Sequence, residues 1–289
     1  MLPAMASRRA VLVLFVAVAA TSVAVALAQA AAGPDYSYVP GTKLGPENWA
    51  KLSPAYSACN GGASVRKQSP IDIVTKNAVS RPDLDTLNRT YDATDSTLIN
   101  NGKEISMTLN GKAGTVSIGG KVFSLKKLQW RTPSEHTING KRHPVEVQLV
   151  HENVAGNGEI AIIAILYKVG APDSFYFQLK KELAELAADK CKYGEEDARS
   201  AMGLVHLRSL QKRTGSYFRY MGSLTAPPCT ENVYWNVLGK VRQMTQEQLN
   251  MLIAPLPAAA KPNARPVQPL NGRVVTFYNP PNSTISFEM

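Results

Sequence analysis

Long runs of one charge are missing from this sequence. Lysine and arginine together account for 32 of the 289 residues, aspartate and glutamate for 22, and the formal net charge is +10. The basic residues are scattered, without a run of five or more and without a stripe of interleaved aromatic residues. A nucleic-acid-binding surface is usually built from such a stripe, so we expect no nucleic-acid partner.

Long apolar runs are also rare, because the only one lies at the N-terminus. Arg8 and Arg9 precede an apolar run over residues 10–28, and residues 28–30 (Ala-Gln-Ala) offer a small-residue cleavage site. This order is typical of a secretory signal peptide, which we assign to residues 1–30. Without a second long apolar run, we expect no membrane association once the signal is removed.

The predicted destination is the secretory pathway, either outside the cell or in the vacuole. The paired arginines are also compatible with a twin-arginine signal, which makes the chloroplast or thylakoid lumen the alternative, although no transit segment precedes them. Past the signal we find no repeat and no linker that would divide two domains. We therefore predict a single domain over residues 35–280 and a C-terminal tail over residues 281–289.

Cysteine is scarce as well, since Cys59, Cys191 and Cys229 are the only three. In an oxidising compartment two of them would pair and one would be left over. Secretion also makes Asn88 and Asn282 candidate glycosylation sites, because each opens an Asn-x-Ser/Thr sequon.

Helical patterns are few, and short alternating strands take their place. Ile105, Met107 and Leu109 alternate with polar residues, and Asn-Gly pairs predict hairpin turns. The continuous apolar run over residues 160–169 predicts a central strand covered on both faces. Two helices and one polar insertion are predicted after this strand. The helices cover residues 173–188 and a short segment capped by Thr245, and the insertion covers residues 189–211.

The stretch over residues 121–151 predicts two strands joined by a loop. Successive strand residues point to opposite faces, which sorts the side chains into sets. One face of the first strand carries Phe123, Leu125, Lys127, Gln129 and Arg131, the other Leu128 and Trp130, and one face of the second strand carries Glu146, Gln148 and Val150.

This stretch resembles the metal-binding core of the α-class carbonic anhydrases, in particular the plant members. The family pattern is close to H-W-H-(S/T)-P-S-E-H-x-x-N-G followed by E-x-H-L-V-H, where this chain has W-R-T-P-S-E-H-T-I-N-G and E-V-Q-L-V-H. Further matches are G-P-E-N-W, Q-S-P-I-D, Y-M-G-S-L-T-A-P-P-C-T-E and N-A-R-P-V-Q-P, so the resemblance covers residues 36–278. It implies a mainly β fold, a large and mostly antiparallel twisted β-sheet with a conical pocket and a few short peripheral helices.

The three histidines that hold zinc in the family fall on Gln129, Arg131 and Gln148. Zinc activates the water that attacks carbon dioxide, and a histidine ligand must offer a neutral lone pair. Arginine has none and places a positive charge about where the cation would sit. Two amide oxygens beside a guanidinium make neither a zinc nor a calcium site. We therefore predict no metal and no cofactor; zinc would be the cofactor only if the chain were an active enzyme.

The four histidines of the chain do not replace the missing ligands. His136 and His151 match structural positions of the family, and the parity of His151 is opposite to that of Gln148. His143 lies in a loop and His206 in the polar insertion.

Part of the family's catalytic frame is retained. Thr225 matches the threonine that orients the zinc-bound hydroxide, and Glu135 the carboxylate that accepts its proton. Glu146 matches the carboxylate behind the third histidine, and Leu224 matches a residue of the apolar carbon dioxide pocket. A buried Thr–Glu hydrogen bond also stabilises a loop, so a structural role explains the retention equally well. The proton-shuttling histidine falls on Lys103, which titrates too high to shuttle near neutral pH.

The resemblance also implies a disulfide between Cys59 and Cys229, with Cys191 left free or buried. We predict a secreted carbonic-anhydrase-like protein without zinc or hydratase activity, which acts in binding, interaction or storage. Plant storage proteins of the dioscorin type, which also lack at least one zinc histidine, offer an analogy. The alternatives are an active carbonic anhydrase and a protease inhibitor or other binder that uses surface loops.

Three cations, Lys103, Lys127 and Arg131, are expected at the pocket in place of one zinc ion. A concave site lined by one sign of charge concentrates counter-ions, and a guanidinium binds a carboxylate or phosphate through two hydrogen bonds. The predicted partner is therefore a small anion or carboxylate. The alternative is that Arg131 turns back onto Glu135 as an internal ion pair while both lysines stay in solvent.

Overall fold

The computed structural model of the protein describes residues 35–60, 66–189, 197–211 and 215–280. The predicted signal peptide and C-terminal tail lie outside these residues, and so do Asn282 and Cys191. None of the helices in this described part is long and apolar enough to cross a membrane.

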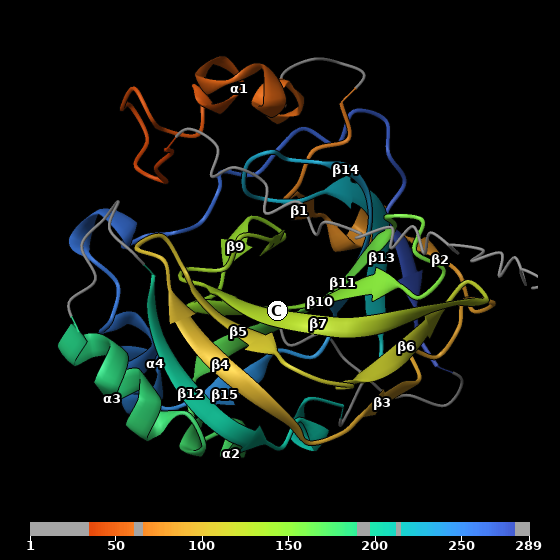
Figure 1. Cartoon of the computed structure of the whole chain (residues 1–289). Helices are drawn as coiled ribbons and strands as arrows, with labels where there is room; N and C mark the ends of the chain where they lie inside the picture. The colour runs from red at the N-terminus through yellow and green to blue at the C-terminus, as the bar shows by residue number, and fades with distance from the viewer. Residues whose placement is uncertain (1–34, 61–65, 190–196, 212–214, 281–289) are drawn as a thin grey trace, which may run out of the picture. The chain divides into compact units, whose positions relative to one another are not determined.

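The described part of the chain is built on one large sheet of 13 strands, most of which are labelled in Figure 1. Along the sheet the strands follow the order β12-β4-β5-β7-β10-β11-β14-β13-β16-β2, while β15 pairs with β11, and β6 joins β3 to β7. In chain order these strands are β2 (Val79–Ser80), β3 (Arg89–Tyr91), β4 (Thr94–Asn100), β5 (Ile105–Leu109), β6 (Gly114–Ile118), β7 (Lys121–Arg131), β10 (Val145–Asn153), β11 (Ile160–Val169), β12 (Ala198–Val205), β13 (Tyr217–Ser223), β14 (Glu231–Leu238), β15 (Arg242–Met244) and β16 (Thr276–Tyr278).

A three-stranded sheet and several short helices complete the described part. The small sheet has the order β1 (Asp72–Ile73), β8 (Thr137–Ile138) and β9 (Lys141–Arg142). The helices are α1 (Trp49–Leu52), α2 (Ser174–Phe177), α3 (Lys180–Asp189) and α4 (Gln246–Ile253), with 3-10 turns η1 (Pro54–Cys59), η2 (Thr75–Asn77), η3 (Arg208–Gln211) and η4 (Ala258–Ala260). Most strand pairs are antiparallel; the parallel ones in the described part are β1–β8, β11–β14, β11–β15 and β16–β2. The predicted fold class is confirmed.

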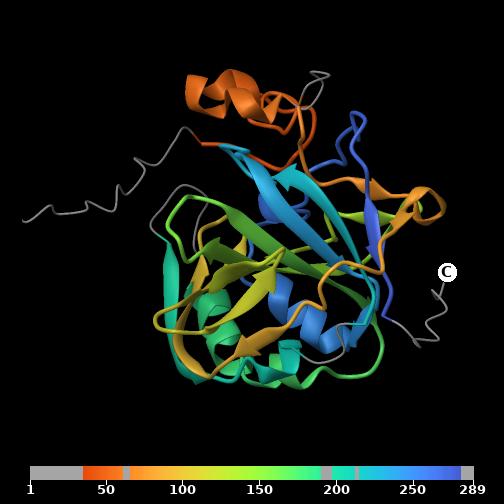
Figure 2. The ribbon, with the colours of Figure 1, turned by 90° about the vertical axis from the view of Figure 1, so that its right-hand side faces the viewer.

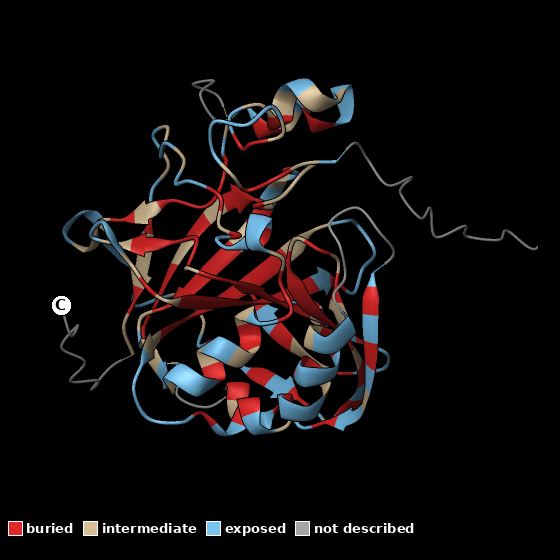
Figure 3. Ribbon diagram, turned by 90° about the vertical axis from the view of Figure 1, so that its left-hand side faces the viewer, coloured by how far each residue is buried: buried red, intermediate tan, exposed pale blue. Residues whose placement is uncertain are grey.

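Helices cover one face of the large sheet, and Figure 3 shows their buried sides in red. Leu128 and Trp130 of β7 belong to the same apolar cluster as Leu183 of α3 and Leu252 of α4. Burial of such side chains is the main force that holds α3 and α4 on the sheet, at about 2 kcal/mol for each fully buried large apolar side chain.

The strand β11 is buried on both faces, as its continuous apolar run predicts. Ile163 and Ile165 belong to the larger cluster, whereas Ile162 and Ala164 belong to a second cluster on the opposite face together with Trp235. The strand lies between β10 and β14, which leaves neither of its edges open over most of its length.

The helix predicted over residues 173–188 is two helices in the structure. α2 ends at Phe177, where Gln178 follows as its C-terminal cap, and α3 begins at Lys180. The side chain of Gln178 binds both the backbone N–H and the backbone carbonyl of His206. These tertiary hydrogen bonds hold the chain at the break. The second predicted helix is confirmed, since Thr245 caps α4 in a capping box.

The insertion predicted over residues 189–211 contains an edge strand, β12, so that prediction was wrong in part. β12 pairs with β4 along one side only, and exposed residues interrupt its buried ones. A bulge between Ala201 and Gly203 also breaks the alternation of side chains. An edge strand with a bulge buries too few residues at regular spacing to be recognised from sequence.

A second bulge lies in β7, and because of it the predicted face of Phe123 and Leu125 was wrong. Lys127 pairs with Val150 of β10, but the next pair joins Leu125 to His151, so one residue of β7 is skipped. The skip reverses the alternation, and Phe123 and Leu125 lie in the larger apolar cluster together with Leu128 and Trp130.

Candidate functional site

The three positions that match zinc ligands meet at the end of the β7–β10 pair. The register places Gln129 opposite Gln148 and Arg131 opposite Glu146. Gln129 Nε2 donates to Gln148 Oε1 at 2.5 Å. Gln148 Nε2 donates to Glu135 Oε2 at 2.8 Å and to Glu146 Oε1 at 2.9 Å. The two amides therefore form one hydrogen-bonded network with the retained carboxyls.

Arg131 adjoins this network through Glu135 and is only 1% exposed. Its Nη1 contacts the carboxylate of Glu104, and its Nε lies 3.3 Å from Glu135 Oε2. The guanidinium carbon lies 5.4 Å from the centroid of the Tyr38 ring. The predicted Arg131–Glu135 ion pair is present, and Glu104 adds a second carboxylate that the sequence interpretation did not include.

Burial and charge act in opposite directions on these groups. Burial raises the pKa of the Glu104 carboxyl, but Arg131 and Lys127 lower it more, so the pKa lies below its ordinary value. Burial lowers the pKa of Arg131, while Glu104 foremost, and Glu135 with it, raise it well above its ordinary value. Arg131 and Glu104 are therefore held as a charged pair inside the protein.

The Glu135 carboxyl has the opposite tendency. Burial raises its pKa, Arg131 lowers it, and the nearby Glu146 raises it again, with a net rise. Its oxygens also accept hydrogen bonds from the backbone N–H of Arg265 and from Gln148. Thr225, 2% exposed, adjoins Glu135 and lowers its pKa slightly. Within the described part of the chain, however, Thr225 Oγ1 forms no hydrogen bond of standard geometry.

Glu146 is engaged by a histidine. His136 Nδ1 lies 2.9 Å from Glu146 Oε1, and the backbone N–H of His136 donates to Oε2 at 2.8 Å. His136 Nε2 lies 2.6 Å from the hydroxyl of Tyr220. Burial raises the pKa of Glu146, but His136 lowers it more, so the net shift is downward. His136 is a hydrogen-bonded structural residue, and so is His151, which contacts the hydroxyl of Tyr91 at 2.7 Å.

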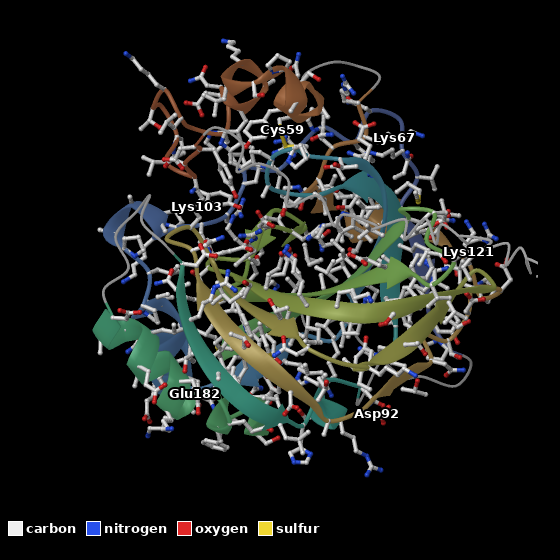
Figure 4. All side chains as sticks on the ribbon, in the orientation of Figure 1. Cys59, Lys67, Asp92, Lys103, Lys121 and Glu182 are labelled. Atoms are coloured by element: carbon white, nitrogen blue, oxygen red, sulfur yellow. A yellow bond between two sulfur atoms is a disulfide. The ribbon has the colours of Figure 1, made fainter. Side chains whose placement is uncertain are left out.

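The two lysines of the predicted cationic site each lie near a carboxylate. Lys103, labelled in Figure 4 on the loop between β4 and β5, pairs with Asp35 at 2.8 Å and is 17% exposed. Lys127 lies 4.0 Å from Glu104 and is 42% exposed. Leu224 is partly buried and packs against the second apolar cluster, which contains Trp235. The prediction that both lysines stay in solvent therefore fits Lys127 better than Lys103.

The segment of residues 35–60 is tied to the site region by a disulfide and by a buried arginine, and Figure 2 shows it in orange. The predicted Cys59–Cys229 bond is present. Arg265 donates to the carbonyl of Cys59 at 2.9 Å, to Gln68 Oε1 at 2.9 Å and to the carbonyl of Ser69 at 2.8 Å. Burial lowers the pKa of Arg265 to about 10.

The sequence interpretation missed Glu104, Tyr38 and Arg265. The place of Glu104 follows only from the register of the structure, in which it immediately precedes Ile105, the partner of Trp130. The next position along that register faces Arg131, and opposite charges are favoured across strands. Arg265 stands in the N-A-R-P-V-Q-P motif, but nothing in that motif indicates the carbonyls it binds.

The donor set of this site does not fit zinc. Arg131 occupies one ligand position with a paired guanidinium, and the amides of Gln129 and Gln148 bind each other. Among residues 35–60, 66–189, 197–211 and 215–280, no three His, Cys, Asp or Glu side chains are grouped so that they could hold a metal ion. A tetrahedral zinc site requires neutral imidazoles or anionic ligands that point at one centre.

The glycosylation candidate that lies within the described residues is accessible. Asn88 is exposed, and its Oδ1 accepts a hydrogen bond from the hydroxyl of Thr86 at 3.3 Å. Thr90, the third residue of the sequon, is exposed as well.

Comparison with known proteins gives one family. The profile described as eukaryotic-type carbonic anhydrase matches residues 44–279. Alpha carbonic anhydrase 7 of Arabidopsis thaliana is 39% identical over 246 residues, which are 85% of this chain and 86% of that relative. Dioscorin DB3L of Dioscorea polystachya is 38% identical over 245 residues, which are 84% of this chain and 86% of that relative.

Solved structures lead to the same family. The crystal structure of dioscorin complexed with ascorbate has a TM-score of 0.79 at 34% identity and covers 86% of this chain and 100% of its own. The α-carbonic anhydrase from Thermovibrio ammonificans, in complex with the inhibitor sulfanilamide, has a TM-score of 0.69 at 33% identity, with coverages of 84% and 99%. On its sequence and on its fold, the chain belongs to the eukaryotic-type carbonic anhydrase family.

Proposed function

We propose that this protein is a zinc-independent member of its family that does not hydrate carbon dioxide and acts as a binding or storage protein. The observation that carries the proposal is the Arg131 guanidinium, buried at a ligand position and paired with Glu104 and Glu135. Zinc at this place would face a positive charge a few ångströms away in a desolvated environment, where like charges repel strongly.

Two further parts of the hydratase reaction, the activated water and the proton shuttle, would be missing as well. Zinc supplies the nucleophile by ionising a bound water, and without it carbon dioxide meets only neutral water. Lys103 stands where the family has its proton-shuttling histidine, and here it is paired with Asp35.

The second candidate function is an active carbonic anhydrase, which the retained Thr225, Glu135 and Glu146 favour. Each of the two carboxyls has another role, however. Glu146 binds His136 and Gln148, and Glu135 accepts from Gln148 and Arg265. Loss of either carboxylate would leave several buried donors unpaired, which explains the retention without catalysis.

A secretory location and a small anionic ligand complete the proposal. The Cys59–Cys229 disulfide supports an oxidising compartment, extracellular or vacuolar, with the chloroplast lumen as the alternative. The relative dioscorin has been solved in complex with ascorbate, a small ligand, which supports a small anion or carboxylate as the partner here.

Metal analysis of the purified mature protein tests the proposal. We expect no stoichiometric zinc and no hydration of carbon dioxide above background in a stopped-flow assay. The positive control is the triple variant Gln129→His, Arg131→His, Gln148→His, which should recover zinc binding, because three imidazoles then face the retained carboxyls. Single substitutions should not recover it. One zinc per wild-type chain would refute the proposal.

The ligand class is tested separately by thermal unfolding with bicarbonate, sulfate, phosphate and small carboxylates at matched ionic strength. At least one anion should stabilise the wild type more than the Arg131→Gln variant. Equal effects on both proteins would mean that Arg131 takes no part in anion binding.

A further inference from the structure

In the described part of the chain, four of the ten buried polar side-chain atoms that lack a hydrogen bond belong to Arg131, Tyr38 and Thr225. These four are Nε and Nη1 of Arg131, the hydroxyl oxygen of Tyr38 and Oγ1 of Thr225. The Tyr38 ring lies against Arg131, and Thr225 adjoins Glu135, which pairs with Arg131. None of Arg131, Tyr38 and Thr225 is more than 2% exposed. Buried polar groups normally have partners, so such a cluster requires an explanation.

The chemistry of these atoms selects the kind of group that would satisfy them. A guanidinium only donates hydrogen bonds, and both hydroxyls can donate. Each of these groups would therefore be satisfied by an acceptor, and a negative charge would be favoured beside Arg131. A planar carboxylate fits a guanidinium best, because its two oxygens match two parallel N–H groups.

The chain supplies one carboxylate at this place, that of Glu104. Its position follows from the pairing of β5 with β7, since Ile105 lies opposite Trp130 and the preceding residue lies next to Arg131. The contact with Nη1 is close, but within the described residues Nη1 has no hydrogen bond of standard geometry. Glu104 thus neutralises Arg131 without satisfying it fully.

Glu104 is more exposed than Arg131 and contacts a lysine that is more exposed still. Its side chain is 10% exposed and that of Arg131 is 1% exposed, while the neighbouring Lys127 is 42% exposed. Removal of the Glu104 side chain would therefore take away the carboxylate that contacts the buried guanidinium and vacate the space that it fills.

We propose that Arg131 and Tyr38 form a binding site for small planar carboxylates and that Glu104 is a built-in competitor for this site. The inference rests on the proposed function and deepens it, because it names the ligand class and the residue that regulates access. An external carboxylate binds at Arg131 only when the Glu104 side chain moves aside, so wild-type affinity is weak and rises when Glu104 is removed.

Chemical rescue of a Glu104→Ala variant tests this inference. Formate, the smallest carboxylate, is titrated while the thermal unfolding midpoint is followed, with chloride at matched ionic strength as the reference. We expect a saturable rise of the midpoint in the variant, half-complete at a formate concentration about tenfold or more below that needed by the wild type. If Glu104→Ala does not fold, Glu104→Ser, which keeps an acceptor near Arg131, takes its place.

Two control variants test whether the response to formate requires Arg131 and whether it is specific to the loss of Glu104. The double variant Glu104→Ala, Arg131→Gln should show no saturable response to formate, because the guanidinium is absent. The variant Glu152→Ala removes an exposed carboxylate of β10 and should respond as the wild type does.

Three outcomes would overturn the inference. The first is a response of Glu104→Ala to formate that equals its response to chloride, which is also the result expected if water alone satisfies the buried donors. The second is an equal response of the double variant, and the third an equal gain in Glu152→Ala. None of these outcomes depends on zinc, so failure of the proposed function through metal binding would be recognised independently.

Discussion

Both faces of β7 are buried near its C-terminal end, but different interactions stabilise them. Leu128 and Trp130 point into the larger apolar cluster, where burial of surface provides the stability. Gln129 and Arg131 point to the opposite side, where they are equally buried but held by amides and carboxylates. Neighbouring residues on one strand thus depend on different forces.

The two faces should differ in how much stability is lost when a residue is substituted. An apolar contact is non-directional, so a side chain of similar volume retains most of it. A buried ion pair is close to neutral in net free energy when intact but costly when only one partner remains. The apolar face should therefore respond gradually to substitution, whereas the polar face should respond abruptly.

The largest expected effect is that of Arg131→Leu. We expect it to lower the free energy of unfolding by about 3–5 kcal/mol, because Glu104 and Glu135 then stay buried without their cation. Chemical denaturation at pH 7 measures this loss. The double variant Arg131→Leu, Glu104→Leu should recover part of the stability; a double variant as unstable as the sum of the two single losses would show that the pair is not coupled.

Acidification should destabilise the protein through a polar residue on the apolar side, His151. Burial lowers its pKa to about 3, so the folded state excludes a proton that the unfolded chain binds near pH 6.5. Stability is complete above pH 6.5 and falls as the pH falls toward 3, with a loss of about 3 kcal/mol by pH 4. Denaturation at pH 7 and pH 4 should show a smaller difference in His151→Gln than in the wild type. An unchanged difference would exclude His151 as the cause.

Conservative substitutions on the two faces make the sharpest comparison. Leu128→Met should cost less than about 1.5 kcal/mol, because volume and polarity are nearly kept. Gln148→Met, of similar size, should cost more, since it leaves Gln129 without its acceptor and removes one donor each from Glu135 and Glu146. Equal costs in urea unfolding would contradict the proposed difference between the faces.

The smallest effect is expected at Lys127, where the polar face reaches solvent. Its distance of 4.0 Å from Glu104 and its exposure of 42% make a screened and weak ion pair. Lys127→Ala should change the free energy of unfolding by about 0.5 kcal/mol or less. A loss several times larger in the same urea assay would mean that the polar network extends to the surface.

Features that depend on local periodicity or on a family pattern could be predicted from the sequence. The buried strand at residues 160–169, the cap of α4 and the opposite orientations of Gln148 and His151 follow from the spacing of residues. The Cys59–Cys229 disulfide and the grouping of Gln129, Arg131 and Gln148 follow from the resemblance to the family.

Features that depend on register between distant segments could not be predicted. The bulge that turns Phe123 and Leu125 toward the helices changes no residue type and leaves no mark in the sequence. Glu104 contacts Arg131 only because the loop after β4 brings β5 into one particular alignment with β7. A loop glutamate next to a lysine looks like ordinary solvated charge until that alignment is known.

Arg265 has a consequence for the order in which the chain can be completed during synthesis. It binds the carbonyl of Cys59, 206 residues earlier, and Gln68, 197 residues earlier. Nearly the whole domain must therefore leave the ribosome before Arg265 can bind the N-terminal segment. Until then Trp49 lacks the guanidinium that lies over its ring. Contacts of such sequence separation form late and slowly. A nascent chain that ends before residue 229, and so has neither the disulfide partner of Cys59 nor Arg265, should leave residues 35–60 open to proteolysis, and chain extension past residue 265 should protect them.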